Sequence, residues 1–348
     1  MQVNQIGSLC KHKHYECRGN VMELVLVTGI SGYVGQHVAT ELLNAGYRVR
    51  GTVRDEAKSA SVLKNLGGFA DTKNLEFVKA DLLNDKGWDD AVKGCAFVLH
   101  IASPFVLAVP KDENELIAPA VEGTQRVLNA AKRAGVKRAV LTSSVVAMTS
   151  GRASGNYGTD SWSDLTANIG AYAKSKTLAE QAAWDIVKDG EIELVTINPG
   201  FMLGPAIGKS GDGQSIAMIA GLISGKLPMV PQVAMGMVDV RDVAKLHVAA
   251  MKDKKSAGKR YIASTAEPVA MSKLAATLRG AGYSKVPSIK APNFMIKMMG
   301  LFDREAKGMV PELGRMISYD ISDTVDSLNW EPTPIDKSVL EMAASISK

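Results

Sequence analysis

Tyr172 and Lys176 are the two residues of this sequence whose types and spacing are best suited to chemistry. Side chains four residues apart lie on the same face of a helix. A neighbouring ammonium group lowers the pKa of a phenol by stabilising the phenolate, which makes a tyrosine useful in proton transfer. Ser144 follows a predicted strand, and its hydroxyl group is suited to orienting a carbonyl oxygen. Together these three residues predict a site that protonates a carbonyl oxygen while a hydride reaches the carbon.

A glycine-rich turn provides a place for the cofactor that would supply the hydride. The turn follows an apolar strand predicted over residues 24–28 and precedes an amphipathic helix. In this context, backbone N–H groups and the positive end of the helix dipole bind a pyrophosphate, and a Cβ atom on Gly29 or Gly32 would obstruct its approach. The contacts that we expect from the turn are Gly29, Gly32, Tyr33, Val34 and Gly35.

The residues after the second predicted strand indicate which nicotinamide cofactor binds. Arg54 lies where an acidic residue would bind a free ribose 2′-hydroxyl, and a guanidinium group binds a 2′-phosphate with two hydrogen bonds. Lys58, one helical turn later, adds a second positive charge. We therefore predict NADPH. The alternative is that Arg54 is simply exposed and that Asp55 binds the ribose of NAD.

Asp81 and Leu82 follow the third predicted strand, at the edge of the sheet where open α/β folds bind their ligands. We expect both residues to contact the cofactor, with Asp81 binding the adenine amino group. An equally good interpretation is that Asp81 caps a turn.

Short apolar segments alternate with helical segments from residue 23 onward, as parallel βαβ units require. The predicted strands span residues 24–28, 47–53, 75–79, 97–102, 138–143 and 193–198, and the clearest helices span 33–45, 115–134 and 171–188. This pattern predicts an α/β fold, a Rossmann-type doubly wound parallel sheet with a smaller mixed C-terminal substrate-binding lobe. We assign residues 23–203 and about 236–265 to the dinucleotide-binding domain, and residues 204–235 and 266–348 to the lobe. Residues 237–244 read as a strand that enters a helix.

The overall composition excludes several classes of protein. With 46% hydrophobic and 22% charged residues the chain is typical of globular proteins, and its net charge of +5 comes from interleaved charges, so we expect no nucleic-acid partner. No apolar run approaches the roughly 20 residues that span a bilayer, so we expect no membrane association. Three cysteines are too few for a disulfide framework in a chain of this length, which favours the cytoplasm.

Residues 1–22 differ from the rest of the chain and are expected to form a disordered extension. Cys10, His12, His14 and Cys17 lie close together there, which raises the alternative of a zinc site. Their spacing matches no common zinc pattern, so we predict no metal.

The motifs taken together resemble the extended short-chain dehydrogenase/reductase family, within the NAD-dependent epimerase/dehydratase superfamily. The similarity rests on residues 28–35, Ser144, residues 172–176 and residues 198–200. Residues 51–55, 100–104, 175–180 and 238–244 further resemble its dihydroflavonol 4-reductase branch, which includes cinnamoyl-CoA reductases and microbial NADPH-dependent aldehyde and methylglyoxal reductases.

This resemblance implies roles for individual residues. Ser144, Tyr172 and Lys176 would form the catalytic triad, and Arg54 and Lys58 would contact the 2′-phosphate. The nicotinamide would be lined by Ala102, Ser143, Pro199 and Met202. Tyr172 and Lys176 would also contact the cofactor.

Two departures narrow the expected substrate. Residues 145–149 lack the Asn or Asp with which plant flavonoid reductases contact a phenolic ring, and residues 169–172 lack the Asn-Trp-Tyr-Cys stretch of cinnamoyl-CoA reductases. The sequence therefore predicts an NADPH-dependent reductase of a small aldehyde or ketone, a monomer or homodimer, with Tyr172 as the proton donor.

Two alternatives stay open at this point. The first is an NAD-dependent nucleotide-sugar epimerase or dehydratase, against which Arg54 argues. The second is a non-catalytic dinucleotide-binding sensor, against which the complete set of Ser144, Tyr172 and Lys176 argues.

Overall fold

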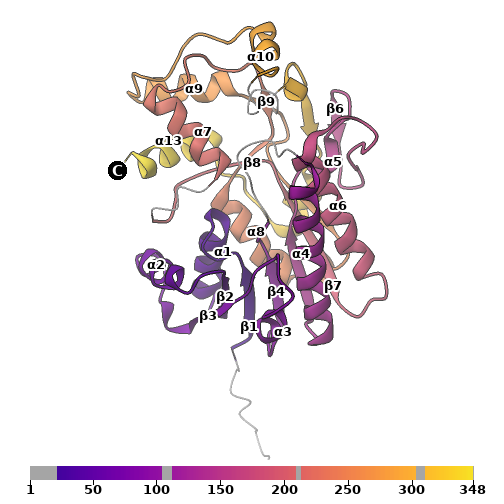
Figure 1. The fold of residues 1–348 in the computed structure, drawn as a ribbon. Helices are drawn as coiled ribbons and strands as arrows, with labels where there is room; N and C mark the ends of the chain where they lie inside the picture. The colour runs from indigo at the N-terminus through magenta and orange to yellow at the C-terminus, as the bar shows by residue number, and fades with distance from the viewer. Residues whose placement is uncertain (1–21, 104–111, 209–212, 303–309, 348) are drawn as a thin grey trace, which may run out of the picture.

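A parallel β-sheet forms the centre of the molecule. The computed structural model describes residues 22–103, 112–208, 213–302 and 310–347, and within them seven strands pair in the order β11-β7-β5-β4-β1-β2-β3 (Figure 1). These strands are β1 (Leu24–Thr28), β2 (Arg48–Val53), β3 (Leu75–Lys79), β4 (Phe97–His100), β5 (Arg138–Thr142), β7 (Glu193–Pro199) and β11 (Arg260–Ala263). The predicted Rossmann-type α/β fold is confirmed, and β11 is a seventh strand that the sequence analysis missed.

Helices cover both faces of this sheet, which explains why its strands are almost continuously apolar. Leu24 and Leu26 of β1 belong to one hydrophobic core, and Val25 and Val27 belong to another on the opposite face. The helices on the first face are α3 (Trp88–Val92), α4 (Asn114–Arg133) and α6 (Gly170–Ile186), and those on the second are α1 (Tyr33–Asn44), α2 (Ala57–Leu66) and α8 (Val240–Lys252). The sheet is therefore held between two cores.

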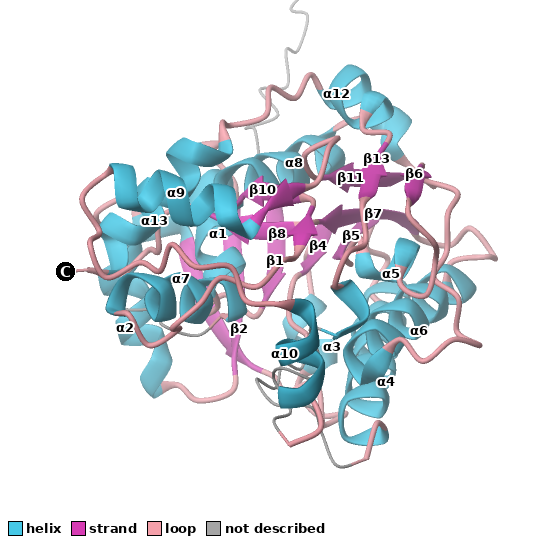
Figure 2. Ribbon diagram, turned by 90° about the horizontal axis from the view of Figure 1, so that it is seen from above, coloured by secondary structure: helices cyan, strands magenta, loops and turns pink. Residues whose placement is uncertain are grey.

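Most of the remaining elements lie beyond the carboxyl ends of the strands, in the upper part of Figure 1, whereas α12 (Ser322–Leu328) packs against β11 and α8. The remaining elements are α5 (Val146–Thr149), β6 (Gly155–Tyr157), β8 (Phe201–Leu203), α7 (Gln214–Ser224), β9 (Ala234–Met235), β10 (Met237–Asp239), β12 (Val269–Ala270), α9 (Met271–Gly280), α10 (Asn293–Met299), β13 (Ile317–Tyr319), α12 and α13 (Ile335–Ile346). The six strands among them form three small pairs, β12-β9, β10-β8 and β13-β6, and Figure 2 shows the last two. As predicted, the strand β10 enters a helix, α8, after which β11 joins the large sheet.

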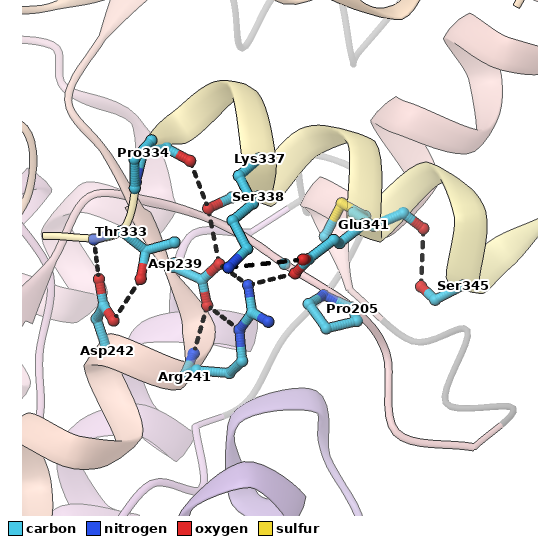
Figure 3. A network of polar contacts seen from close by, with 12 residues as sticks. Pro205, Asp239, Arg241, Asp242, Thr333, Pro334, Lys337, Ser338, Glu341 and Ser345 are labelled. Carbon is cyan, nitrogen blue, oxygen red and sulfur yellow. Dashed lines mark hydrogen bonds and ion pairs between the residues drawn. The ribbon is translucent and has the colours of Figure 1, made fainter. Parts of the chain in front are cut away.

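An ion network fastens the C-terminal helix α13 to the start of α8 (Figure 3). The buried carboxylate of Asp239 accepts hydrogen bonds from Arg241 at 2.7 and 2.9 Å and from the hydroxyl of Ser338 at 2.7 Å. Arg241 also pairs with Glu341 at 2.6 Å. Since Ser338 and Glu341 belong to α13, the C-terminal end of the described chain is anchored beside the sheet.

The four residues considered as a zinc site, Cys10, His12, His14 and Cys17, lie outside the described residues. Among the residues that are described, no helix combines the length and the apolar character that crossing a bilayer requires.

Candidate active site

The predicted site residues follow neighbouring strands along one edge of the sheet. Because β2, β1, β4, β5 and β7 lie side by side and are parallel, their carboxyl ends meet at the same edge. In this order, those ends carry Arg54, the turn that begins at Gly29, Ala102, Ser144 and Pro199. The structure therefore arranges the predicted residues in a row that suits an elongated ligand.

The three glycines of the turn have different tasks. Gly29 has a φ of +66°, and a Cβ atom there would lie 3.0 Å from the Cα of Ala102. A Cβ atom on Gly35 would lie only 2.2 Å from the backbone oxygen of Gly29, so Gly35 is needed to close the turn. At Gly32 the nearest described atom would be the same oxygen at 3.3 Å, with nothing else within 4 Å. Gly32 therefore presents the open side of the turn, whereas Gly29 and Gly35 serve the protein's own packing.

The helix α1 begins at this turn without a cap. Its N-cap residue is Gly32, which has no side chain that could cap the first turn, and no acidic residue occupies that turn. The first N–H groups of a helix have no intrahelical acceptor, and they carry the positive end of its dipole. The uncapped helix start and the open side of Gly32 fit a phosphate group.

The side chains of Tyr33 and Val34 are engaged within the protein, and contact of these two residues with the cofactor stays a prediction. The phenol of Tyr33 is buried and donates a hydrogen bond to the backbone oxygen of Gly204 at 2.7 Å. Val34 is buried in the core on the same side of the sheet. Their side chains therefore support α1 from within, and only their backbone amides remain for a ligand.

The charged residues after β2 differ in whether their side chains have partners within the described part of the protein. Arg54, Asp55 and Lys58 are all exposed, but Asp55 accepts a hydrogen bond from the backbone N–H of Ala57 at 3.0 Å. Among the described residues, the side chains of Arg54 and Lys58 have no hydrogen bond or ion pair. Two unpaired cations thus border the edge of the sheet, while the acidic neighbour stabilises the start of α2.

Asp81 caps a turn, which is one of the two interpretations considered above. Its carboxylate accepts a hydrogen bond from the backbone N–H of Leu83 at 3.1 Å. Leu82 packs against Gly123 of α4, where a Cβ atom would lie 2.9 Å from the Cβ of Leu82. Contact of either residue with adenine stays a prediction.

Tyr172 and Lys176 both lie on α6, as their spacing predicted. The buried positions of α6 are mostly small residues, including Ala173 and Ala183, which lets this helix pack closely on α4. Burial raises the pKa of Tyr172 to about 12 and lowers the pKa of Lys176 to about 8. The sequence predicted a lowered pKa for Tyr172, whereas burial raises it. At neutral pH the phenol is therefore protonated and Lys176 is charged.

The two serines after β5 face different surroundings. Ser144 is partly exposed, and its hydroxyl contacts the backbone oxygen of Pro199 at 3.4 Å and the N–H of Val146 at 3.3 Å. Ser143 is buried, and its hydroxyl donates a hydrogen bond to Glu180. Ser144 is thus the serine whose side chain is accessible, whereas the hydroxyl of Ser143 faces Glu180. Contact of Ser143 with the nicotinamide stays a prediction.

Thr28, at the end of β1, is a residue whose role sequence reasoning missed. Its hydroxyl oxygen accepts hydrogen bonds from the N–H groups of Ile101 at 3.0 Å and Ala102 at 2.9 Å, and it lies 2.8 Å from Nδ1 of His100. These contacts hold the end of β4 beside the glycine turn. Burial lowers the pKa of His100 to about 3, so this histidine is neutral and serves the core.

Comparison with known proteins gives the family. The model of the NAD dependent epimerase/dehydratase family matches residues 25–263. The chain belongs to this family. It is 34% identical over 340 residues to cinnamoyl-CoA reductase CAD2 from Medicago truncatula, covering 94% of this chain and 97% of the relative. It is 37% identical over 268 residues to dihydroflavonol 4-reductase from Zea mays, covering 73% of each chain.

Solved structures show the same architecture. Gre2 from Candida albicans, in complex with NADPH, superposes with a TM-score of 0.77 at 27% identity, over 93% of this chain and 98% of that one. The resemblance to extended short-chain dehydrogenases/reductases is confirmed, and so is the assignment of the chain to the oxidoreductases of that family.

Proposed function

We propose that this protein reduces an aldehyde or ketone to an alcohol with NADPH, and that Tyr172 donates the proton. The observation that carries the proposal is the arrangement of one sheet edge. A glycine turn with an uncapped helix lies near one end, and a protonated phenol on a helix shared with a charged lysine lies at the other.

The chain's own residues account for the proton transfer. NADPH supplies the hydride when it is bound. Arrival of the hydride turns the carbonyl oxygen into an alkoxide, which is a much stronger base than a phenolate, so a phenol with a pKa of about 12 still gives up its proton to it. The ammonium group of Lys176 stabilises the phenolate that remains, and the hydroxyl of Ser144 orients the carbonyl oxygen.

The preference for NADPH rests on Arg54 and Lys58. Both side chains are unpaired among the described residues and border the edge of the sheet near the glycine turn, where they would bind a 2′-phosphate. The structural relative from Candida albicans binds NADPH, which supports the same choice. The pyrophosphate would bind at the open side of Gly32, in the turn that Gly29 and Gly35 allow to close.

The substrate is a small carbonyl compound that would bind between the sheet edge and the C-terminal elements. The relatives named above are reductases. Residues 145–149 and 169–172 depart from the flavonoid and cinnamoyl-CoA patterns, which favours a general aldehyde or ketone. We propose residues 204–235 and 266–348 as the lobe that selects it.

The test is NADPH oxidation by the purified protein against a panel of aldehydes, ketones and 1,2-dicarbonyl compounds. We expect turnover on at least one class, with the matching alcohol as product. Absence of turnover on the whole panel, with protein that binds NADPH, would overturn the proposal.

A further inference from the structure

Glu180 is a fully buried carboxylate on α6, one helical turn after Lys176. Four side-chain donors from several elements converge on it. They are the hydroxyl of Ser143, Nδ2 of Asn198 at 2.9 Å, Nε of Arg260 at 2.7 Å and Nε1 of Trp184 at 3.3 Å. The hydroxyl of Thr196 lies 3.2 Å from the carboxylate and 3.0 Å from Oδ1 of Asn198, and its one hydrogen serves one of these two acceptors. A buried carboxylate with this many donors is costly to remove and forms a rigid junction.

One oxygen of this carboxylate joins the three segments that carry the proposed chemistry. Oε2 binds both Ser143, at the end of β5, and Asn198, in β7. The same Nδ2 of Asn198 lies 3.2 Å from the backbone oxygen of Ser144. The helix of Tyr172 and Lys176 is thereby linked to the backbone of Ser144 through one side chain of β7.

The other oxygen of Glu180, Oε1, forms an ion pair with Arg260 at 2.7 Å. Arg260 is itself almost fully buried, and its guanidinium lies 4.0 Å from the ring centre of Trp162. Its Nη1 donates hydrogen bonds to the backbone oxygens of Thr159 and Ser161, each at 2.7 Å. The guanidinium is thus fixed by contacts that do not involve Glu180, and it forms a buried ion pair with Oε1.

We propose that Glu180 is a positioning residue of the reductase: its charged carboxylate sets Ser144 in register with the helix that carries Tyr172 and Lys176. Glu180 does not itself touch the ligand, because Ser143 and Asn198 lie between it and Ser144. The negative charge also raises the pKa of Lys176 against the larger, opposite effect of burial. The inference rests on the proposed reductase function.

A control exists at the opposite ends of the same two strands, where the carboxylate of Glu193 is half-exposed whereas that of Glu180 is fully buried. Glu193, which begins β7, accepts a hydrogen bond at 2.8 Å from Nε of Arg138, which begins β5 and is buried. Glu193→Gln therefore removes a carboxylate from a buried arginine, as Glu180→Gln does, but at the amino edge of the sheet. It tests loss of stability without disturbing the proposed site.

The experiment measures kcat and the KM for NADPH of the wild type, Glu180→Gln, Glu180→Asp and Glu193→Gln, each normalised to the fraction that binds NADPH in a fluorescence titration. In Glu180→Gln an amide NH₂ group faces the donors of Ser143 and Asn198, so the link to Ser144 is disturbed and we expect kcat to fall by about 100-fold. We expect the KM for NADPH to stay within about twofold of the wild type, because the glycine turn is remote from Glu180. Glu180→Asp keeps the charge and both acceptor oxygens and recovers part of the loss. Glu193→Gln keeps the kcat of the wild type although its melting temperature falls.

Two results would overturn the inference. One is a kcat of Glu180→Gln close to that of the wild type, and the other is an equal loss of kcat in Glu180→Gln and Glu193→Gln. If Glu180→Gln does not fold, Asn198→Ala breaks the same link without a change of charge, and the same fall in kcat is expected; an unchanged kcat refutes the link. Failure of the reductase function itself is recognised separately, because the wild type would then turn over no carbonyl compound, and the positioning role would fall with it.

Discussion

Asp55 accepts a hydrogen bond from the backbone N–H of Ala57 at 3.0 Å, at the start of α2. This contact gives one oxygen of the Asp55 carboxylate a partner within the protein. Its neighbour Arg54 is exposed and unpaired among the described residues. We therefore propose that Asp55 supports the fold and that Arg54 contacts the cofactor.

The first prediction concerns this division. Arg54→Gln removes a charge-assisted contact to the 2′-phosphate, and we expect the KM for NADPH to rise about tenfold or more while the KM for NADH changes little. Asp55→Asn is the control, because an asparagine oxygen still accepts the N–H of Ala57. A large effect of Asp55→Asn on NADH, with none of Arg54→Gln on NADPH, would reverse the assignment.

The second prediction concerns the closure of the glycine turn. A Cβ atom on Gly35 would lie 2.2 Å from the backbone oxygen of Gly29, so Gly35→Ala should lower the free energy of unfolding by about 1–3 kcal/mol and weaken NADPH binding. Gly280→Ala is the matched control, because no described atom lies within 4 Å of its Cβ position in α9. We expect that control to be within about 0.5 kcal/mol of the wild type in urea unfolding. Equal effects of the two substitutions would show that the turn is not tightly closed.

The third prediction concerns stability at acidic pH. His247 is fully buried, with Nε2 2.7 Å from Oγ1 of Thr142 and Nδ1 2.7 Å from the backbone oxygen of Val243. Burial lowers its pKa to about 4 from an ordinary value of 6.5. The unfolded chain therefore binds a proton at higher pH than the folded protein does. The stability that neutral His247 contributes is present above pH 6.5 and is lost as the pH falls toward about 4.

Urea unfolding between pH 7 and pH 4 measures this loss. His247→Gln should flatten the acid dependence of the unfolding free energy relative to the wild type, by an amount on the order of 1 kcal/mol per unit of pKa difference. An unchanged slope would mean that His247 does not contribute to the acid dependence.

The fourth prediction concerns activity at alkaline pH. Burial lowers the pKa of Lys176 to about 8, so its ammonium group loses its proton above that value. Since the charged lysine stabilises the phenolate, kcat/KM for reduction should fall as the pH rises through about 8. Lys176→Arg keeps its charge throughout this range, so any activity that it retains should lack this decline. A wild-type profile that stays level well above pH 8 would contradict the role of Lys176.

The sequence predicted the sheet well because its strands are apolar and bounded by turns. It extended the fourth strand to residue 102, whereas β4 ends at His100. The reason is that the N–H groups of Ile101 and Ala102 bond to the hydroxyl of Thr28, a side chain 73 and 74 residues away along the chain. Strand β11 escaped prediction because it is only four residues long and begins with a charged residue.

The sequence predicted those features of the site that follow from the spacing of residues in a motif, and it did not predict those that depend on burial. The spacing of Tyr172 and Lys176 placed them correctly on one helix. The high pKa of Tyr172 and the inward direction of Ser143 depend on tertiary packing, which spacing does not reveal. Glu180 lies in the segment 175–180 on which the family resemblance partly rests, but its burial against Arg260, 80 residues later, depends on tertiary packing.

The central claim is that a hydride moves from NADPH to a carbonyl carbon while Tyr172 protonates the oxygen. The most direct test uses NADPH with deuterium at the transferred position and mass spectrometry of the alcohol formed by the wild type and by Tyr172→Phe. We expect the wild-type product to carry one deuterium, and Tyr172→Phe to form it at least about 100-fold more slowly while NADPH binds as before. Product formed by Tyr172→Phe at the wild-type rate, or an alcohol without deuterium, would contradict the mechanism.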